Sequence, residues 1–477
     1  NMYIPCSPNP ARIIRIYFVV EKERRYMQFI IVGCRNVGTT LTEQLSSEEH
    51  NITVIDLEKN RLQNLINSYD AMGVIGNGIS FAVQKEAGVE EADLLIAVTG
   101  SDEVNLLCCL IARKAGGCHT IARVRNPIYN MEIGYIKDEL GLSMIINPEY
   151  TAAEEMTRLL KFPSAITIDS FTKGRVEVVK CRVGEDSALC DQSLQQITSR
   201  IKGDVLICTV ERDGDVYIPG GNFIIRARDE ISVVGTSQKT LAFFKKLGVP
   251  VTRARNVMII GGGKTSYYLA KQLMAMGIQI KIIEINKERC DELSELLPKA
   301  FIIHGDGTDR NLLLQEGIIQ AEAFVALTNV DEENIMLSLF AKSVSKAKLI
   351  THVHRISYDE IIDSLDIGSV IYPKYLTAEH IIKYVRAMNN SLGSNIETLY
   401  RLNDNRVEAL EFSIKKDSPV IGIPLQKMAI KPNILICSIN HKGSISIPSG
   451  QSVIRAGDSV IVVTTYTRLN DIKDILK

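Results

Sequence analysis

The chain of 477 residues has no tryptophan, and no apolar run approaches the ~20 residues that a membrane-spanning helix needs. Its charge is nearly balanced, with 55 Lys and Arg residues against 56 Asp and Glu residues and a formal net charge of -1. These features argue against a membrane-interface protein and against a nucleic-acid protein that binds through bulk positive charge. No two of the ten cysteines are spaced as C-x-x-C, so we expect buried, reduced thiols rather than a disulfide or zinc framework.

Residues 1–26 do not fit the pattern of the sequence that follows. Their best apolar run, Ile13–Val20, is short and contains Arg15, unlike a secretory signal. From Met27 the sequence MQFIIVG passes directly into a strand pattern. We therefore expect residues 1–26 to be an upstream or non-native extension and the folded part to begin at Met27.

The rest of the chain is an internal duplication. FIIVGCRNVG aligns with VMIIGGGKTS, and VIDLEKNR aligns with IIEINKER at the same spacing. Near the far ends of the two copies, PGGNFIIRARDEISVVGT aligns with PSGQSVIRAGDSVIVVTT. The two copies align from their first strands to their far ends, which indicates two folded units rather than a short solenoid repeat.

Each copy starts with short Val- and Ile-rich runs separated by amphipathic segments of helix length. In the first copy the runs are FIIVG, ITVIDL, AMGVIG, LLIAVTG, HTIARV and SMIINP. This alternation predicts βαβ units and a Rossmann-like, doubly wound parallel sheet. Each copy ends in short strands with hairpin signals at Arg212–Asp215 and His441–Gly443, which predict a small α+β, mostly β, lobe.

The sequence thus predicts an α/β protein with four lobes. The expected bounds are 27–165 and 251–390 for the two Rossmann-like domains, and 166–250 and 391–477 for the two smaller lobes.

The first strand of the first copy leads into a glycine-rich turn. Gly33 and Gly38 hold the first and third positions of G-x-G-x-x-G, where glycines allow a tight turn and the following helix N-terminus attracts phosphate. Arg35 holds the middle position, so its guanidinium either contacts phosphate or lies in solvent. Asp56 ends the second strand, where a carboxylate binds ribose hydroxyls and disfavours a 2′-phosphate, although a helix N-cap is an alternative role.

The second copy repeats this arrangement in VMIIGGGKTS. Two glycines of the pattern are present, Ser266 replaces the third, and Glu284 corresponds to Asp56. No Walker A pattern is present. Two copies of strand, turn and acid make a nucleotide site a stronger expectation than one motif would.

Residues that follow the other strands complete the candidate sites. A doubly wound sheet binds its ligand outside the carboxyl ends of its strands, where Thr99 and Thr328 stand. Arg123 would reach a phosphate, and its counterpart His352 would do so more weakly. Turn formation and helix capping are the alternative roles for several of these residues. The candidate nucleotide-binding residues are Gly33, Cys34, Arg35, Asn36, Val37, Gly38, Asp56, Asn77, Thr99, Gly100, Arg123, Gly261, Gly262, Gly263, Lys264, Thr265, Glu284, Asp306, Thr328, Asn329 and His352.

The sequence offers no candidate catalytic centre. We find no histidine–carboxylate pair beside a nicotinamide position, no G-x-S-x-G motif, no metal-ligand cluster and no separate substrate domain. Two nucleotide domains and two small lobes use the whole length, which favours a sensor over an enzyme. An NAD-dependent oxidoreductase and a free-standing nucleotide sensor with a non-transport partner are the alternatives.

The duplicated order of Rossmann-like domain and small β lobe resembles the TrkA family, peripheral regulators of Trk potassium-uptake systems that are built from RCK (KTN) N-lobes and C-lobes. The most specific features are the start MQFIIVG, the acid at Asp56, the run GVEEADLLIAVTGSDEVN and the lobe ends ISVVG and VIVVT. The resemblance extends from Met27 to Lys477. It implies one nucleotide site at Gly33–Gly38, Asp56, Thr99 and Arg123, and another at Gly261–Thr265, Glu284, Thr328 and His352.

The resemblance also implies ligands, partners and location. The expected ligands are NAD or NADH, together with ATP or ADP. Family members form rings on the cytoplasmic face of a membrane potassium-translocating subunit, here expected through apolar helix faces such as NIMLSLFAKSV. We therefore expect a non-catalytic, peripheral cytoplasmic subunit that binds no metal and no nucleic acid. Nucleotide would gate potassium uptake through its different affinities for two states of a hinge between lobes.

Overall fold

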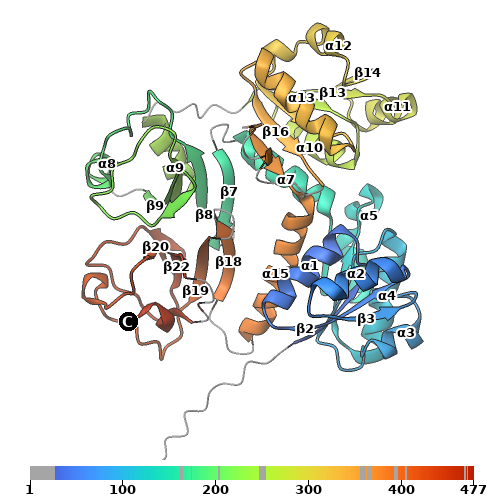
Figure 1. Cartoon of the computed structure of the whole chain (residues 1–477), viewed down its shortest axis with the longest axis horizontal. Helices are drawn as coiled ribbons and strands as arrows, with labels where there is room; N and C mark the ends of the chain where they lie inside the picture. The colour runs from blue at the N-terminus through green and yellow to red at the C-terminus, as the bar shows by residue number, and fades with distance from the viewer. Residues whose placement is uncertain are drawn as a thin grey trace, which may run out of the picture.

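The computed structural model describes residues 27–161, 165–172, 175–201, 205–246, 254–354, 361–362, 365, 367–391, 396–402, 406–466, 469 and 471–477. The expected extension over residues 1–26 and the expected lobe junction at residues 250–251 lie outside the described residues. Figure 1 shows two α/β lobes on one side of the molecule and two smaller β lobes on the other.

The first α/β lobe, here called the first N-lobe, is a parallel six-stranded sheet in the order β3-β2-β1-β4-β5-β6. The strands are β1 (Gln28–Val32), β2 (Asn51–Asp56), β3 (Met72–Ile75), β4 (Leu94–Ala97), β5 (His119–Arg123) and β6 (Met144–Ile146). The helices are α1 (Asn36–Ser47), α2 (Lys59–Ser68), α3 (Phe81–Glu86), α4 (Asp102–Gly116), α5 (Pro127–Met131) and α6 (Ile133–Leu140). The central strands are apolar on both faces because helices cover both faces of the sheet.

The second N-lobe repeats this order as β14-β13-β12-β15-β16-β17. Its strands are β12 (Asn256–Ile260), β13 (Gln279–Glu284), β14 (Phe301–His304), β15 (Ala323–Ala326), β16 (Lys348–His352) and β17 (Ser369–Ile371). Its helices include α10 (Lys264–Ala275), α11 (Lys287–Leu296), α12 (Arg310–Gln315), the 3-10 turn η2 (Ile318–Gln320) and α13 (Asp331–Val344). In each sheet the strand order reverses beside the first strand, which creates the crevice where such folds bind ligands. The predicted Rossmann-like fold is confirmed in both copies.

The helices that follow the two sheets, α7 (Pro148–Lys161) and α15 (Pro373–Ser391), are exchanged between the copies. Helix α15 of the second copy packs on α1, and its Ile381 and Val385 join the core of the first N-lobe with Phe29. Helix α7 of the first copy packs on α10, and its Met156 joins the core that contains β12 of the second N-lobe. The sequence patterns did not predict this exchange.

The two small lobes, here called the C-lobes, are antiparallel sheets in the orders β10-β9-β11-β8-β7 and β18-β19-β22-β20-β21. The first contains β7 (Ala165–Phe171), β8 (Val176–Arg182), β9 (Leu206–Arg212), β10 (Asp215–Tyr217), β11 (Glu230–Gly235), α8 (Leu194–Ile201) and α9 (Ser237–Lys246). The second contains β18 (Ile396–Leu402), β19 (Val407–Ser413), β20 (Ile434–His441), β21 (Ser444–Ser446), β22 (Ser459–Thr464) and the 3-10 turns η3 (Leu425–Lys427) and η4 (Ile472–Ile475). Both predicted hairpins are present, and Gly214 and Gly443 supply their positive φ angles of 85° and 92°.

The two C-lobes pack against each other through a shared apolar cluster. Phe171 and Val178 of the first lobe and Val407 and Ala409 of the second belong to it. At its margin, Thr172 donates from its backbone N and its Oγ1 to the carboxylate of Glu411, at 2.9 and 2.8 Å. The four lobes therefore form two pseudo-symmetric pairs, and the crossed helices α7 and α15 lie between them (Figure 1).

Candidate functional site

The first glycine-rich turn runs from the end of β1 into α1. Gly33 has a φ of 101°, and a Cβ there would lie 3.1 Å from the backbone of Thr99. A Cβ at Gly38 would lie 1.9 Å from the carbonyl oxygen of Gly33. The turn therefore needs both glycines, because no larger residue fits between β1, β4 and the first turn of α1.

The acid at the end of the second strand is bound to this turn in both copies. Asp56 accepts hydrogen bonds from the backbone N of Cys34 at 2.8 Å and of Glu58 at 2.9 Å. Burial raises the pKa of Asp56, but these two N–H donors and Arg61 outweigh burial and lower it, so the carboxylate is ionised at neutral pH. In the second copy Glu284 accepts in the same way from the backbone N of Gly262, at 2.5 Å.

The exposed Arg35 lies at the N-cap of α1 and lines a cavity of about 610 Å³. The cavity is also lined by Arg61 of α2 and by Lys374 and Tyr375 at the start of α15. Two of its lining residues thus come from the other copy, because α15 is an exchanged helix. The lining thus brings three cationic side chains and one carboxyl side chain, Glu43, to the N-terminus of α1.

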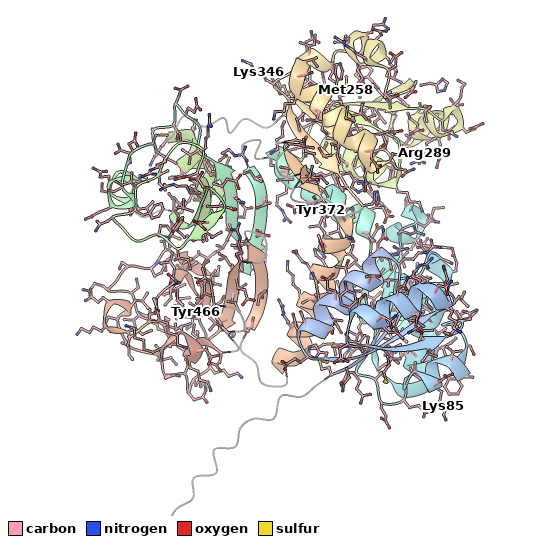
Figure 2. The ribbon with its side chains drawn as sticks, viewed as in Figure 1. Lys85, Met258, Arg289, Lys346, Tyr372 and Tyr466 are labelled. Atoms are coloured by element: carbon pink, nitrogen blue, oxygen red, sulfur yellow. The ribbon has the colours of Figure 1, made fainter. Side chains whose placement is uncertain are left out.

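The second turn has a different charge pattern. Lys264 begins α10 and is exposed. Arg289 of α11, labelled in Figure 2, lies on this lobe. Its Nε donates to the carbonyl oxygen of Gly262 at 2.7 Å and holds the turn in place. The exchanged helix α7 places Glu149 near this turn, at the helix position that Lys374 holds in α15. Burial raises the pKa of Glu149, whereas the charges of Arg125, Arg123 and Lys264 act in the opposite direction.

A buried asparagine connects the ends of the fourth and fifth strands in each copy. Asn105 is fully buried, accepts from Thr99 N at 2.8 Å and Thr99 Oγ1 at 2.7 Å, and donates to the carbonyl of Arg123 at 2.9 Å. Asn334 makes the same three bonds to Thr328 and His352. An asparagine at this position in both copies of the sequence could have indicated this role, whereas one copy alone could not.

The predicted phosphate contacts of the fifth strands occupy different environments. Arg123 donates from Nη2 to the carbonyl of Thr99 at 2.6 Å, while its buried Nε has no hydrogen-bond partner among the described residues. His352 is only 5% exposed, and both of its ring nitrogens are unpartnered within the described part of the chain. Burial lowers the pKa of His352 to about 3, so the imidazole is neutral at pH 7.

The other predicted residues lie around the same two strand edges. Asn77 and Asp306 form tight turns through hydrogen bonds to Ile79 N and Thr308 N. Gly100, Gly263 and Asn329 are exposed, and Asn36 is exposed at the start of α1. Cys34, Val37 and Thr265 are buried, and burial with the neighbouring Asp56 raises the pKa of Cys34 to about 12. Gly261 has a φ of 100° and repeats the role of Gly33.

Two apolar residues at these edges were not predicted as site residues. Leu57 follows Asp56 and is 72% exposed, and Ile285 follows Glu284 and is 66% exposed. An exposed aliphatic side chain directly after the acid of the second strand offers a surface for a flat ring. Leu57 and Ile285 hold matching positions in the two copies, and this match in the sequence could have identified them as site residues.

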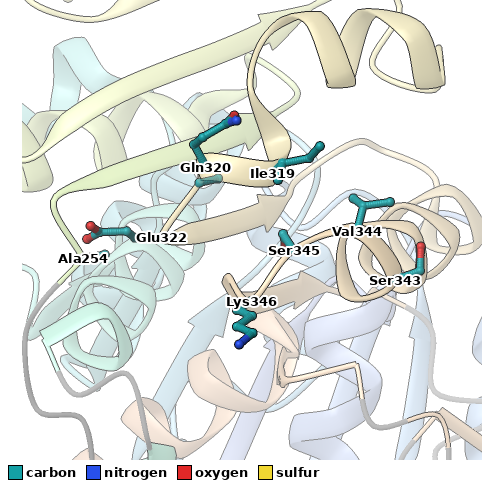
Figure 3. Close-up of a pocket in the computed structure, with 9 residues that line it drawn as sticks. Ala254, Ile319, Gln320, Glu322, Ser343, Val344, Ser345 and Lys346 are labelled. Carbon is teal, nitrogen blue, oxygen red and sulfur yellow. The ribbon is translucent and has the colours of Figure 1, made fainter.

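A second cavity, of about 730 Å³, lies at the opposite end of the second N-lobe (Figure 3). Residues before β12, β15 and β16 line it, among them Ala254, Glu322 and Lys346. This is the amino-terminal edge of the parallel sheet, away from the glycine-rich turn, so the cavity is not part of the nucleotide site. Among the described residues, no group of three or more His, Cys, Asp or Glu side chains is arranged to hold a metal. None of the described helices has the length and apolar character needed to cross a bilayer.

Comparison with known proteins identifies the repeated units. The TrkA-N domain model matches residues 29–148 and 257–373, and the TrkA-C domain model matches residues 178–248 and 409–477. The Trk system potassium uptake protein TrkA of Halomonas elongata is 31% identical, with 94% of this chain and 99% of the relative covered. The TrkA homolog of Archaeoglobus fulgidus is 30% identical, with 94% and 100% covered. Among solved structures, the GsuK channel bound to NAD is 18% identical, with a TM-score of 0.60 over 93% of this chain and 77% of that one.

Proposed function

This chain belongs to the family of proteins built from TrkA-N and TrkA-C domains, and we propose that it is a nucleotide-responsive regulatory subunit of a membrane potassium-uptake system. The observation that carries the proposal is the twice-repeated combination of a glycine-rich turn with an acidic side chain bound to it. The names of the two curated relatives support the transport role, and the NAD bound to the GsuK channel supports a nucleotide ligand.

The residues at the first turn fit a nucleotide such as NAD, NADH, ATP or ADP. Asp56 would accept hydrogen bonds from ribose hydroxyls, and Leu57 would cover one face of the adenine. The free backbone N–H groups at the start of α1, with Arg35 and Lys374, would bind the phosphates. The unpartnered Nε of Arg123 is a further donor at this edge of the described chain. All of these donors and acceptors lie at the carboxyl ends of the strands, where the crevice is.

The second turn would bind nucleotide with a different phosphate environment. Glu284 and Ile285 would repeat the ribose and adenine contacts, and Lys264 and Arg289 supply two cations. Glu149 opposes the charge of Lys264, and His352 is neutral where the first copy has an arginine. We therefore propose that both copies bind nucleotide and that the first site favours the more highly charged ligand.

The exchanged helices give a route from nucleotide to C-lobe. Lys374 and Tyr375 line the first cavity, and α15 continues from them into β18 of the second C-lobe. Likewise Glu149 lies near the second turn, and α7 leads into β7 of the first C-lobe. Nucleotide that binds better to one arrangement of these helices shifts the lobes toward that arrangement. The signal would reach a potassium-translocating subunit on the cytoplasmic face of the membrane.

The assembly that this role requires is a ring of several copies. Helix α13 exposes Met336, of which 65% is accessible, and α4 exposes Leu107, of which 43% is accessible. These apolar surfaces are the proposed contacts between copies.

The proposed bounds of the four lobes are those expected from the sequence. Co-purification of a polytopic potassium-translocating subunit with the chain would test the partner.

The nucleotide role is tested by calorimetric titration of the full chain with NAD, NADH, ATP and ADP, each alone. We expect micromolar binding with two sites per chain. Asp56→Ala and Glu284→Ala should each weaken one site by about 10- to 100-fold, because hydrogen bonds to a charged group contribute about 1.5–3 kcal/mol. The control is Glu86→Ala, which removes an exposed acid at the end of α3 that lines neither turn.

Each outcome of the titration has a distinct meaning. Binding by Glu86→Ala that equals the wild type, with one site weakened in each of the other variants, supports the proposal. Binding that survives both substitutions unchanged would place the nucleotide elsewhere. A chain that binds none of the four nucleotides is not a nucleotide sensor of this kind.

A further inference from the structure

Buried polar side chains join the first N-lobe to the start of helix α10 in the second N-lobe. Tyr268 lies one turn into α10, four residues after Lys264, and is 4% exposed. Its hydroxyl accepts a hydrogen bond from Nδ2 of Asn147 at 3.1 Å and donates to the backbone carbonyl of Arg125 at 3.4 Å. Asn147 follows β6 and Arg125 follows β5. The helix that begins at the second glycine-rich turn is therefore bonded to strand ends of the first copy.

Arg125 is in turn bonded to the crevice edge of the first copy. Its Nη2 donates to the carbonyl oxygen of Gly100, which follows the fourth strand. Its backbone N donates to Oδ2 of Asp102 at 2.9 Å, and its Nε lies 3.5 Å from Oδ1 of the same carboxylate. Asp102 is 6% exposed and begins α4, the helix whose Asn105 binds Thr99. A continuous series of hydrogen bonds thus leads from the first crevice to the start of α10 at the second turn.

The duplication does not repeat this connection from the equivalent position of the first copy. Thr40 is the fifth residue of α1, as Tyr268 is of α10. The Oγ1 of Thr40 donates to the carbonyl of Asn36 within its own helix at 3.0 Å. A hydroxyl has one proton to donate, so this proton is not available to the other copy. The bond from α10 to the first copy is therefore a specific feature of the second turn.

We propose that Tyr268 couples the two nucleotide sites, so that nucleotide bound at either site tightens binding at the other. This inference rests on the proposed function, because it concerns the same two sites. Tyr268 acts here as a positioning residue, since it contacts neither nucleotide itself.

The sign of the coupling follows from what each nucleotide orders. Nucleotide in the first crevice contacts Thr99 and Gly100, and so fixes the strand ends that hold Arg125. The N–H groups at the start of α10, which bind the second nucleotide, are connected to those strand ends through Tyr268. The second nucleotide to bind therefore meets a site that is already partly ordered, which gives positive cooperativity. Coupling between two binding sites is reciprocal, so the order of binding does not matter.

The test is calorimetric titration of the full chain with NAD and, separately, with ATP. Glu284→Ala gives the binding constant of the first site alone, and Asp56→Ala gives that of the second site alone. The coupling factor is the product of the two stepwise constants of the unsubstituted chain divided by the product of these single-site constants. We expect a factor of about 5 or more, the usual lower end for coupled sites.

Tyr268→Phe removes the hydroxyl and keeps the ring, which packs edge-on against Tyr150 with centroids 5.5 Å apart. Introduced into the same three chains, it should reduce the coupling factor to about 1 and leave the single-site constants little changed. The matched control is Tyr267→Phe on the same helix. Tyr267 packs against the ring of Tyr268 at 5.4 Å but takes no part in the hydrogen bonds described above, so this variant should keep the wild-type factor.

Each contrary result has its own meaning. A chain that binds neither nucleotide overturns the proposed function and this inference with it. Binding of both nucleotides at one site only, or at two sites with a coupling factor of 1 or less, overturns the inference and leaves nucleotide binding intact. A factor above 1 that persists in Tyr268→Phe excludes this hydroxyl as the connection. Equal loss of the factor in Tyr267→Phe would assign the coupling to the packing of α10 and exclude the hydroxyl as well.

Discussion

At the scale of single residues, the two glycine-rich turns reach similar shapes with different side chains. Gly38 leaves no room for a Cβ, which would meet the carbonyl of Gly33 at 1.9 Å. Ser266 stands at the same position in the second turn, and its Oγ donates to the carbonyl of Gly261 at 2.5 Å. The second turn thus holds a side chain at this position, and the serine hydroxyl hydrogen-bonds within the turn.

Gly38→Ala should lower the free energy of unfolding of the first N-lobe by about 2 kcal/mol or more, because backbone must move to admit the methyl group. The measurement is urea denaturation of the full chain followed by circular dichroism. The control is Gly134→Ala in α6, where a Cβ would meet nothing within 4 Å and should change stability by no more than about 1 kcal/mol. Equal effects of the two substitutions would show that the turn tolerates a Cβ.

At the scale of elements, the exchange of α7 and α15 joins each N-lobe to a helix of the other copy. The apolar side of α15, including Ile381 and Val385, is fully buried in the first N-lobe. The tyrosine pair Tyr150 and Tyr268 lines the α7–α10 contact, with ring centroids 5.5 Å apart. Neither N-lobe would have a complete core if its neighbour were removed.

Ile381→Ala should destabilise the first N-lobe by about 2–5 kcal/mol although residue 381 belongs to the second copy. Hydrogen exchange should show the loss in β1 and β2, with β12 and β13 little affected. Met156→Ala in α7 is the matched variant and should show the opposite pattern, with faster exchange in the second N-lobe. Faster exchange of β12 alone in Ile381→Ala would contradict the exchange of helices.

At the scale of the whole molecule, the C-lobes pair around an axis that passes close to two equivalent cysteines. Cys208 of β9 and Cys437 of β20 both belong to the shared apolar cluster and are fully buried. Burial, together with the neighbouring Cys208 thiol, raises the pKa of Cys437. The thiol therefore reports whether the two lobes are packed together, since it becomes reactive only when they separate.

Among the cysteines that the structure describes, alkylation of the folded chain with iodoacetamide at pH 8 should modify the partly exposed Cys190 first. Modification of Cys437 should be much slower, because its thiol is fully buried and burial raises its pKa, which removes the reactive thiolate. Mass spectrometry of peptides taken over time measures both rates. The urea-unfolded chain is the control, and both thiols should react there at similar rates. Similar rates in the folded chain would mean that the C-lobes are not paired.

Local patterns in the sequence were enough to predict much of the fold and part of the site. The six strands of each N-lobe follow from apolar runs of strand length, and the positive φ angles of Gly33 and Gly261 follow from the turn motif. Asp56 and Glu284 were found because an acid at the end of the second strand is a local feature. Each of these depends on residues that are close in sequence, where backbone sterics and periodicity act directly.

Only the tertiary structure decided which lobe each exchanged helix covers, and with it the charge around each turn. An amphipathic helix has the same apolar stripe whichever core it joins, so the sequence of α15 does not reveal that Lys374 lies beside Arg35. The same holds for Glu149 near Lys264. The sequence by itself determined the repeated strands, turns and acids, because those rest on local geometry. The pairing of lobes depends on the complementary shape of surfaces far apart in the chain, which only packing selects.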